Sequence, residues 1–201
     1  NLADSMQSRG FGTKKLASVF QPRILEDVTF SYPDQAPIVQ TLTLEVTPGS
    51  LTLISGNTGS GKSTLLKLIQ ARNTGCGYVN QFPREGFVSD NVFDELAFAL
   101  VQQNVPAAEI HSRVNQVAAR FSLQEKLSTD PHTLSAGWQQ RLAIAAALIG
   151  GNKLLLLDEP FSALDTDLRL HLRSEFARHI AEAGIGCVLV THDEAEARAM
   201  G

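Results

Sequence analysis

Short apolar runs alternate with amphipathic stretches along the chain and divide it into predicted strands and helices. Alternating or unbroken apolar residues predict strands at residues 24–32, 42–47, 51–54, 154–157 and 186–191. Helical spacing predicts helices at residues 64–70, from about residue 91, and at residues 106–121, 134–149 and 169–182. The first two strands suit an antiparallel layer, whereas the run at 154–157 is typical of a buried parallel strand. The pattern predicts an α/β fold with an antiparallel β layer and an all-helical insert at about residues 91–150.

A glycine-rich loop follows the strand at residues 51–54 and leads into the next helix. Gly56, Gly61, Lys62 and Ser63 match the pattern G-x-x-x-x-G-K-[ST], with a strand before it and a helix after it. Glycines let the backbone turn tightly, so that its N–H groups can wrap a phosphate chain. Lys62 would reach the β and γ phosphates, and Ser63 would bind Mg²⁺. The alternative is a glycine-rich turn without a ligand, but the four fixed positions and both flanks favour a phosphate loop. Its predicted ligand-binding residues are Gly56, Asn57, Thr58, Gly59, Ser60, Gly61, Lys62, Ser63 and Thr64.

Polar residues stand at the ends of two other predicted strands. Asp158 and Glu159 follow the run at 154–157, which we expect to lie beside the strand that carries the phosphate loop. Asp158 could hold Mg²⁺ through water, and Glu159 could orient or deprotonate the attacking water in phosphoryl transfer. His192 ends the strand at 186–191 and could contact the γ phosphate. The alternatives are a solvated acidic pair in a turn and a structural histidine.

Composition limits the partners and the compartment. The chain has 17 Lys and Arg against 21 Asp and Glu, a formal net charge of -4, so we expect no nucleic-acid partner. No apolar run approaches the roughly 18 to 20 residues that a membrane-spanning helix needs, and the N-terminus lacks a signal-peptide pattern. Any link to a membrane is therefore expected to come through a partner. Cys76 and Cys187 form no CxxC pattern, so we expect no disulfide, no zinc site and a reducing cytosol.

Further motifs make residues of about 22–200 resemble the ATP-binding-cassette (ABC) ATPases. Leu134-Ser135-Ala136-Gly137-Trp138, followed by Gln140-Arg141, resembles the family's signature LSGGQ and the basic residue after it. Residues 162–165 (SALD) resemble the D-loop, and Gln81 resembles the Q-loop glutamine. Tyr32 lies where the family has its adenine-stacking aromatic residue.

This resemblance implies a P-loop NTPase core that binds ATP and Mg²⁺. It implies catalytic roles for Glu159, His192 and Gln81, with Gln81 also at the metal beside Ser63 and Asp158. It implies a head-to-tail dimer with a second ABC ATPase subunit, identical or different, in which Ser135 and Gly137 contact the ATP of the other subunit. ATP would close this dimer and hydrolysis would reopen it. A membrane partner near Gln81 would place the domain at the cytoplasmic face of the cell membrane.

A narrower resemblance is to the energy-coupling-factor ATPases, which drive the uptake of vitamins and transition-metal ions. The pattern Q-x-P followed by V-x-x-E-[LI]-A-F is fitted by Gln81, Pro83, Val92, Glu95, Leu96, Ala97 and Phe98. Arg9-Gly10 resembles the x-R-G motif of the transmembrane coupling component of these transporters. Residues 1–20 would then be an appendage left from a fused transmembrane coupling subunit, before an ATPase domain at residues 21–201. The alternative is an arbitrary leader.

The chain departs from the family pattern at three places. Lys62 and Gln81 are only 19 positions apart (81 − 62), shorter than is usual in the family. Either strands of the antiparallel layer are deleted, or residues of the protein are missing from this sequence. Ala136 and Trp138 replace Gly and Gln in the signature, and Trp138 is bulky for a segment expected to contact a γ phosphate. The chain ends soon after His192, so we expect the domain to be incomplete.

Three functions follow from these observations. The first is an ATPase that powers an energy-coupling-factor importer. The second is a nucleotide-binding module with little activity of its own, working as half of a heterodimer. The third, a soluble ABC ATPase acting in DNA repair or translation, is disfavoured by the acidic balance and the absence of basic clusters.

Overall fold

The computed structural model describes residues 23–31 and 37–192. The predictions for residues 1–20, for Tyr32 and for residues after His192 lie outside the described residues. Three short 3-10 turns, η2 (Pro83–Gly86), η3 (Gln124–Lys126) and η4 (Pro131–Thr133), lie among the helices and strands. In chain order the helices and strands are β1 (Arg23–Phe30), β2 (Val39–Val46), β3 (Leu51–Ser55), α1 (Lys62–Arg72), β4 (Cys76–Val79), α2 (Val92–Gln102), α3 (Ala107–Arg120), α4 (Ala136–Ile149), β5 (Leu154–Asp158), α5 (Thr166–Ala183) and β6 (Gly186–Thr191).

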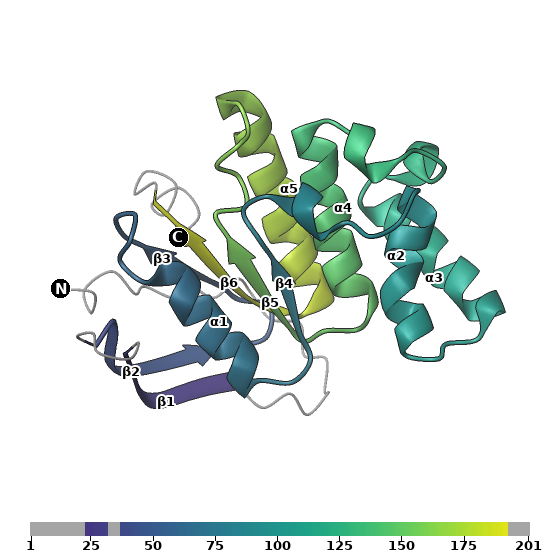
Figure 1. Ribbon diagram of the computed structural model, residues 1–201. Coiled ribbons are helices and arrows are strands. Elements are labelled where there is room, and N and C mark those ends of the chain that lie inside the picture. The colour runs from purple at the N-terminus through teal and green to yellow at the C-terminus, as the bar shows by residue number, and fades with distance from the viewer. Residues whose placement is uncertain (1–22, 32–36, 193–201) are drawn as a thin grey trace.

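A four-stranded parallel sheet, in the order β3-β6-β5-β4, forms the centre of the molecule (Figure 1). Every residue of β5 and β6 is buried, as their unbroken apolar sequences predict. The prediction that β5 lies beside β3 is wrong, because β6 pairs with β3 on one side and with β5 on the other. A local apolar pattern identifies a buried parallel strand but does not encode its neighbours, which depend on where each crossover helix packs.

Alternate residues of the buried strands face two separate layers. Leu154 and Leu156 of β5 belong to a cluster with α1 and with the antiparallel pair β1-β2. Leu155 and Leu157 point to the opposite face, where α5 and the helices of residues 92–149 pack. Figure 1 shows α1, β1 and β2 on one side of the sheet and α4 and α5 on the other. The predicted fold class, α/β with an antiparallel layer and a helical part, is confirmed.

The segment after α1 is short and leads into β4, a strand that the sequence pattern did not predict. Asn73 ends α1, where its side-chain amide donates to the carbonyl of Ile69, and Gly75 has a φ of 74°. Residues 73–75 therefore join α1 to β4 directly, and no further strand lies between them. β4 has only four residues, and it becomes a strand through its parallel pairing with β5.

The helices of residues 92–149 have the expected starting points. The side chain of Asn91 caps α2 by accepting from the N–H of Asp94 at 2.9 Å. Pro106 stands immediately before α3, and Ser135 is the N-cap residue of α4. The buried residues that join the three helices are Val92, Leu96, Leu100, Val114, Ala118, Leu142, Ile144 and Ala145.

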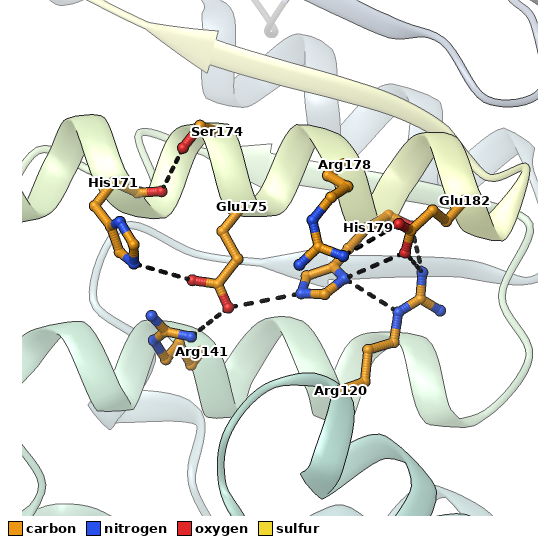
Figure 2. A network of polar contacts seen from close by, with 8 residues as sticks. All are labelled: Arg120, Arg141, His171, Ser174, Glu175, Arg178, His179 and Glu182. Atoms are coloured by element: carbon orange, nitrogen blue, oxygen red, sulfur yellow. Dashed lines mark hydrogen bonds and ion pairs between the residues drawn. The ribbon is translucent and has the colours of Figure 1, made fainter.

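A polar network fastens α3 and α4 to α5 (Figure 2). Arg141 of α4 pairs with Glu175 of α5. Arg120, at the end of α3, donates to the carbonyl of His179 at 2.6 Å and to its Nδ1 at 3.3 Å. The ring of His179 also lies 4.8 Å from that of Phe121, and the residue is only 2% exposed. Because Nδ1 accepts a hydrogen bond, His179 is neutral in this arrangement.

We expect His179 to make the protein less stable at mildly acidic pH. Burial, followed by the charges of Arg120 and Arg178, lowers its pKa below 6.5, although Glu175 opposes the shift. The unfolded chain then binds more protons than the folded chain as the pH falls through 6.5, so the free energy of unfolding decreases there. Urea unfolding between about pH 7.5 and pH 5.5 measures this slope. H179Q should reduce this slope. An unchanged slope in H179Q would contradict this assignment.

We expect Glu95 to stabilise the segment that leads from the sheet into α2. Glu95 is 8% exposed, and its Oε2 accepts from the N–H groups of Val88 and Ser89, both at 2.9 Å. E95A leaves these two donors without that partner and should lower the free energy of unfolding by about 1–3 kcal/mol. E95Q keeps an acceptor and should lose less. E109A, at a carboxylate that is 48% exposed, is the matched control and should change stability by about 0.5 kcal/mol or less in urea unfolding. Equal losses in E95A and E109A would contradict the expectation.

Candidate functional site

The candidate site lies where the parallel strands end. The phosphate loop follows β3, Gln81 comes shortly after β4, Asp158 and Glu159 close β5, and His192 follows β6. The carboxyl ends of parallel strands meet at one edge of a sheet, which is where α/β proteins bind their ligands. The sheet order thus brings together side chains that are more than 100 positions apart in the sequence (192 − 81 = 111).

The loop between β3 and α1 has the geometry of an anion site. Gly59 and Gly61 have φ values of 83° and 90°, which side-chain-bearing residues rarely adopt. A Cβ on Gly61 would also overlap the side chain of Ile38. No described side chain caps the N-terminus of α1, and its first turn holds no acidic residue. The N–H groups and the positive end of this helix are therefore suited to a phosphate.

The ammonium group of Lys62 lies beneath the loop and is bound by backbone carbonyls of the loop. Lys62 is only 7% exposed, and its Nζ donates to the carbonyls of Gly56 at 2.8 Å and of Asn57 at 3.0 Å. The same Nζ lies 3.8 Å from Oε1 of Glu159. The exposed loop residues are Asn57, Thr58, Gly59, Ser60 and Ser63. A phosphate chain could therefore reach the loop from solvent and meet a positive charge beneath it.

Asp158 accepts a hydrogen bond at each of its two carboxylate oxygens. Oδ1 accepts from Ser63 Oγ at 3.0 Å, which joins the two predicted metal ligands. Oδ2 accepts from the hydroxyl of Tyr78 at 3.0 Å. Burial and the neighbouring Asp158 carboxylate raise the pKa of Tyr78, so the phenol keeps its proton and donates. Sequence reasoning missed Tyr78 because it did not predict β4; a tyrosine just before the Q-loop glutamine was the available signal.

The donor set around Asp158 fits Mg²⁺ bound together with a nucleotide. Among the described residues, no group of three or more His, Cys, Asp or Glu side chains could hold a metal ion alone. Mg²⁺ at nucleotide sites takes one or two protein oxygens and completes its shell with water and phosphate oxygens. The hydroxyl of Ser63 and the carboxylate of Asp158 are oxygens of this kind. The side chain of Gln81, which we also expect at the metal, contacts Glu159 and Ser162.

Two of the three predicted catalytic residues, Gln81 and His192, contact the third, Glu159. Oε2 of Glu159 is 2.9 Å from Nδ1 of His192 and accepts from the amide of Gln81 at 3.3 Å. Glu159 itself has a φ of 45°, an unfavourable value for a residue with a side chain. Its N–H donates to the carbonyl of Val190 in β6 at 3.0 Å, and its carboxylate is 15% exposed. The strained backbone thus sits at the point where the carboxylate meets Lys62, Gln81 and His192.

The signature-like segment forms the N-terminus of α4, where Ser135 is exposed and Gly137 is buried. A Cβ on Gly137 would lie 2.8 Å from Cδ2 of Leu168 in α5, so α4 and α5 pack closely at this position and a larger residue would require the Leu168 side chain to shift. Ser135 is the N-cap residue of α4, and its side chain makes no capping hydrogen bond to the helix. This arrangement leaves Ser135 accessible to another subunit.

Trp138 packs against other residues of the helical segment 92–149. Its ring is half-buried, with Arg141 at 5.3 Å and Lys126 at 5.9 Å from the ring centre. The side chain that replaces the family's glutamine thus lies beside two cations, and Ser135 stays exposed.

Comparisons with known proteins agree on a family. The family described as ABC transporter matches residues 39–162. The chain is 39% identical over 189 residues to the Fe(3+) ions import ATP-binding protein FbpC of Pseudomonas fluorescens, covering 80% of this chain and 52% of that protein. It is 37% identical over 187 residues to the spermidine/putrescine import ATP-binding protein PotA of Vibrio parahaemolyticus, covering 83% and 50%. The chain therefore spans about half the length of the curated relatives it matches.

A solved structure supports the same assignment. The structure of cbiO1 from Clostridium perfringens, described as part of the ABC transporter complex cbiONQ, has a TM-score of 0.77 and 27% identity, covering 85% of this chain and 78% of that one. None of the described helices is both long enough and apolar enough to span a bilayer. The two curated relatives are named for different cargoes, so they support a family and not one transporter type. Because the matched segment runs from β2 past the end of β5 and includes both the phosphate loop and the acidic pair, the chain belongs to the ABC transporter family.

Proposed function

We propose that this domain binds ATP with Mg²⁺ and hydrolyses it to drive import across a membrane. The observation that carries the proposal is the position of the Glu159 carboxylate, which lies 3.8 Å from Lys62, 3.3 Å from Gln81 and 2.9 Å from His192. Phosphoryl transfer to water requires a positioned water and neutralised phosphate charge more than covalent chemistry. A carboxylate beside a phosphate-binding lysine meets both requirements.

The binding half of the site consists of the loop and the metal ligands. The N–H groups of residues 56–64 and the Nζ of Lys62 would hold the phosphates. Ser63 and Asp158 would hold Mg²⁺, which neutralises phosphate charge when bound. Tyr32, outside the described residues, is proposed to stack on the adenine.

The reactive half is centred on Glu159. An ionised carboxylate only accepts hydrogen bonds, so Gln81 and His192 would both donate to Oε2. These two donors would hold the carboxylate in one orientation and leave Oε1 to orient or deprotonate the attacking water. His192, half-exposed beside it, could contact the γ phosphate through its other ring nitrogen.

The proposal includes a second ABC ATPase subunit, identical or different, packed head to tail. The exposed Ser135 and the buried Gly137 stand at the N-terminus of α4, a helix end suited to an anion. In such a dimer they would contact the nucleotide held by the phosphate loop of the partner. The indole of Trp138 packs beside Lys126 and Arg141 of its own subunit. This position supports the proposal that Ser135 and Gly137 can still reach the nucleotide of the partner.

A transmembrane coupling subunit would dock near Gln81, at the cytoplasmic face of the membrane. A cavity of about 260 Å³ lies between residues 81–85, the start of α4 and Leu164. Large apolar side chains are exposed on the adjoining loop and on α2: Phe82 (54%), Val88 (65%), Phe98 (47%) and Val101 (55%). Exposed apolar side chains beside a cavity suit a protein partner.

The most specific parts of the proposal are the transported cargo and the boundaries of the domain. We favour vitamins or transition-metal ions, because residues 81–98 fit the energy-coupling-factor pattern and cbiO1 is a structural relative. Relatives named for Fe(3+) and polyamine import leave the cargo to experiment. We also propose that residues 1–20, with Arg9-Gly10, derive from a fused coupling subunit and that residues 21–201 form the ATPase domain.

We expect E159Q to lower kcat for ATP hydrolysis by about 10²- to 10⁴-fold, because glutamine cannot act as a general base. ATP binding should persist, since Lys62 and the loop are unchanged. Phosphate release and equilibrium ATP binding measure the two effects on the purified protein and its complex. E26Q, at an exposed position in β1, is the control and should hydrolyse at the normal rate. Full turnover by E159Q in the complete complex would refute the proposal. Turnover that appears only after mixing with another ATPase subunit would identify a partner-dependent module.

We expect F98E to weaken binding to the membrane component by about 10-fold or more, because it places a charge in the exposed apolar surface of α2. L170E is the matched control, since Leu170 is 53% exposed on α5. Binding of each variant to the purified membrane component gives the comparison. Equal weakening by both substitutions would argue against docking beside Gln81.

A further inference from the structure

We propose that Tyr78 is a positioning residue whose hydroxyl orients the Asp158 carboxylate for the magnesium site. The inference rests on the proposed binding of Mg-ATP and adds a residue that lies outside the phosphate loop, the acidic pair and the Q-loop. It is carried by the hydrogen bond from Tyr78 Oη to Asp158 Oδ2 at 3.0 Å.

Strand register places this hydroxyl beside the carboxylate. β4 runs parallel to β5, and Tyr78 lies opposite Leu156, two positions before Asp158. Residues two apart on a strand share a face, so Leu156 and Asp158 point to the same side of the sheet. This is the side covered by α1, which carries Ser63 in its first turn. A tyrosine is long enough to reach along the strand to the diagonal neighbour.

The carboxylate of Asp158 is held from two directions. Ser63 of α1 donates to Oδ1, and Tyr78 of β4 donates to Oδ2. The terminal torsion of an aspartate is broad, so one donor alone would let the carboxylate plane turn. Donors on both oxygens fix the plane, and Asp158 is only 8% exposed, which limits replacement of the phenol by water. Oδ2 is therefore the anchored oxygen, and Oδ1 is the oxygen beside the metal-binding hydroxyl of Ser63.

The strand that carries Tyr78 is itself firmly placed. β4 pairs with β5 along its whole length, from Cys76 opposite Leu154 to Val79 opposite Leu157. On the face opposite Tyr78, a Cβ on Gly77 would lie 2.7 Å from the carbonyl oxygen of Ala147 in α4. With a strand on one edge and a helix against one face, the backbone at Tyr78 has little room to move. The hydroxyl is thus held by the fold and not only by its own hydrogen bond.

A fixed carboxylate matters because Mg²⁺ demands near-octahedral geometry. Outer groups that orient a metal-binding side chain typically change metal affinity by about 10- to 100-fold when they are removed. The role of Tyr78 should therefore appear as a change in the magnesium dependence of nucleotide binding. Loss of a purely structural tyrosine would instead change stability, or would weaken nucleotide binding equally with and without the metal.

The test is Y78F, which keeps the ring and its packing and removes only the hydroxyl. Binding of a fluorescent ATP analogue to the purified protein is measured in excess Mg²⁺ and in EDTA. We expect the gain in affinity that Mg²⁺ provides to fall by about 10-fold or more, with binding in EDTA unchanged within about 2-fold. C76A is the matched control, because Cys76 lies two positions away on the same face of β4 and its thiol contacts the carbonyl of Asn73. C76A should keep the full Mg²⁺ effect.

A second variant tests whether Tyr78 acts through the metal site. In S63A, which lacks the metal-binding hydroxyl, Y78F should reduce the Mg²⁺ effect by less than it does in the unaltered protein, because the two residues hold one carboxylate. Urea unfolding in EDTA shows that the variants are folded.

Three results would overturn the inference or its basis. A normal Mg²⁺ effect in Y78F refutes the positioning role, as does equal weakening in Mg²⁺ and in EDTA. Absence of any Mg²⁺-supported ATP binding in the unaltered protein refutes the proposed function itself. The two failures are therefore distinguishable.

Discussion

The parallel pairing of β5 with both of its neighbours is the constraint on which the site depends. β5 is buried along its whole length, pairs with β4 on one edge and with β6 on the other, and ends at Asp158. The polar groups gather at one edge only because all four strands point the same way. A slip of β5 by one residue against its neighbours would turn Leu155 and Leu157 away from the helical face of the sheet and would move Asp158 away from Ser63. The apolar core and the polar site are thus fixed by the same hydrogen-bonded register.

Unfavourable local features at this edge are balanced by contacts from other elements. Glu159 has a strained backbone, and its carboxylate is met by Gln81 from the segment after β4, by His192 from the end of β6 and by Lys62 from α1. Lys62 is almost fully buried, but two carbonyls and a nearby carboxylate compensate its charge. Each of these groups is costly alone. Together they form a cluster that is polar, connected and open towards the exposed loop.

Local sequence was sufficient for most elements and for the loop, and insufficient for what depends on long-range pairing. The unbroken runs of β5 and β6 and the glycine pattern before Lys62 act over a few residues, so the sequence predicts them directly. β4 has only four residues, with Gly75 before it and Gly77 inside it, and it exists because β5 pairs with it. Tyr78 and the position of β6 between β3 and β5 were missed for the same reason. The surroundings of Trp138 are long-range as well, because Lys126 lies in another element and its contact with the ring, like that of Arg141, is visible only in the folded chain.

The contact between α4 and α5 links the signature-like segment to the reactive carboxylate. Gly137 allows α4 to approach Leu168, and Arg141 pairs with Glu175 farther along α5. Asp165 precedes α5 and caps it by accepting from the N–H of Leu168, and residues 159–164 lead directly from the end of β5 into this cap. Ser135 and Glu159 are therefore parts of one packed unit, although they belong to different helical and sheet elements. A second subunit that bound at Ser135 would act on the same unit that holds Glu159, so dimer contact and catalytic geometry would be mechanically coupled.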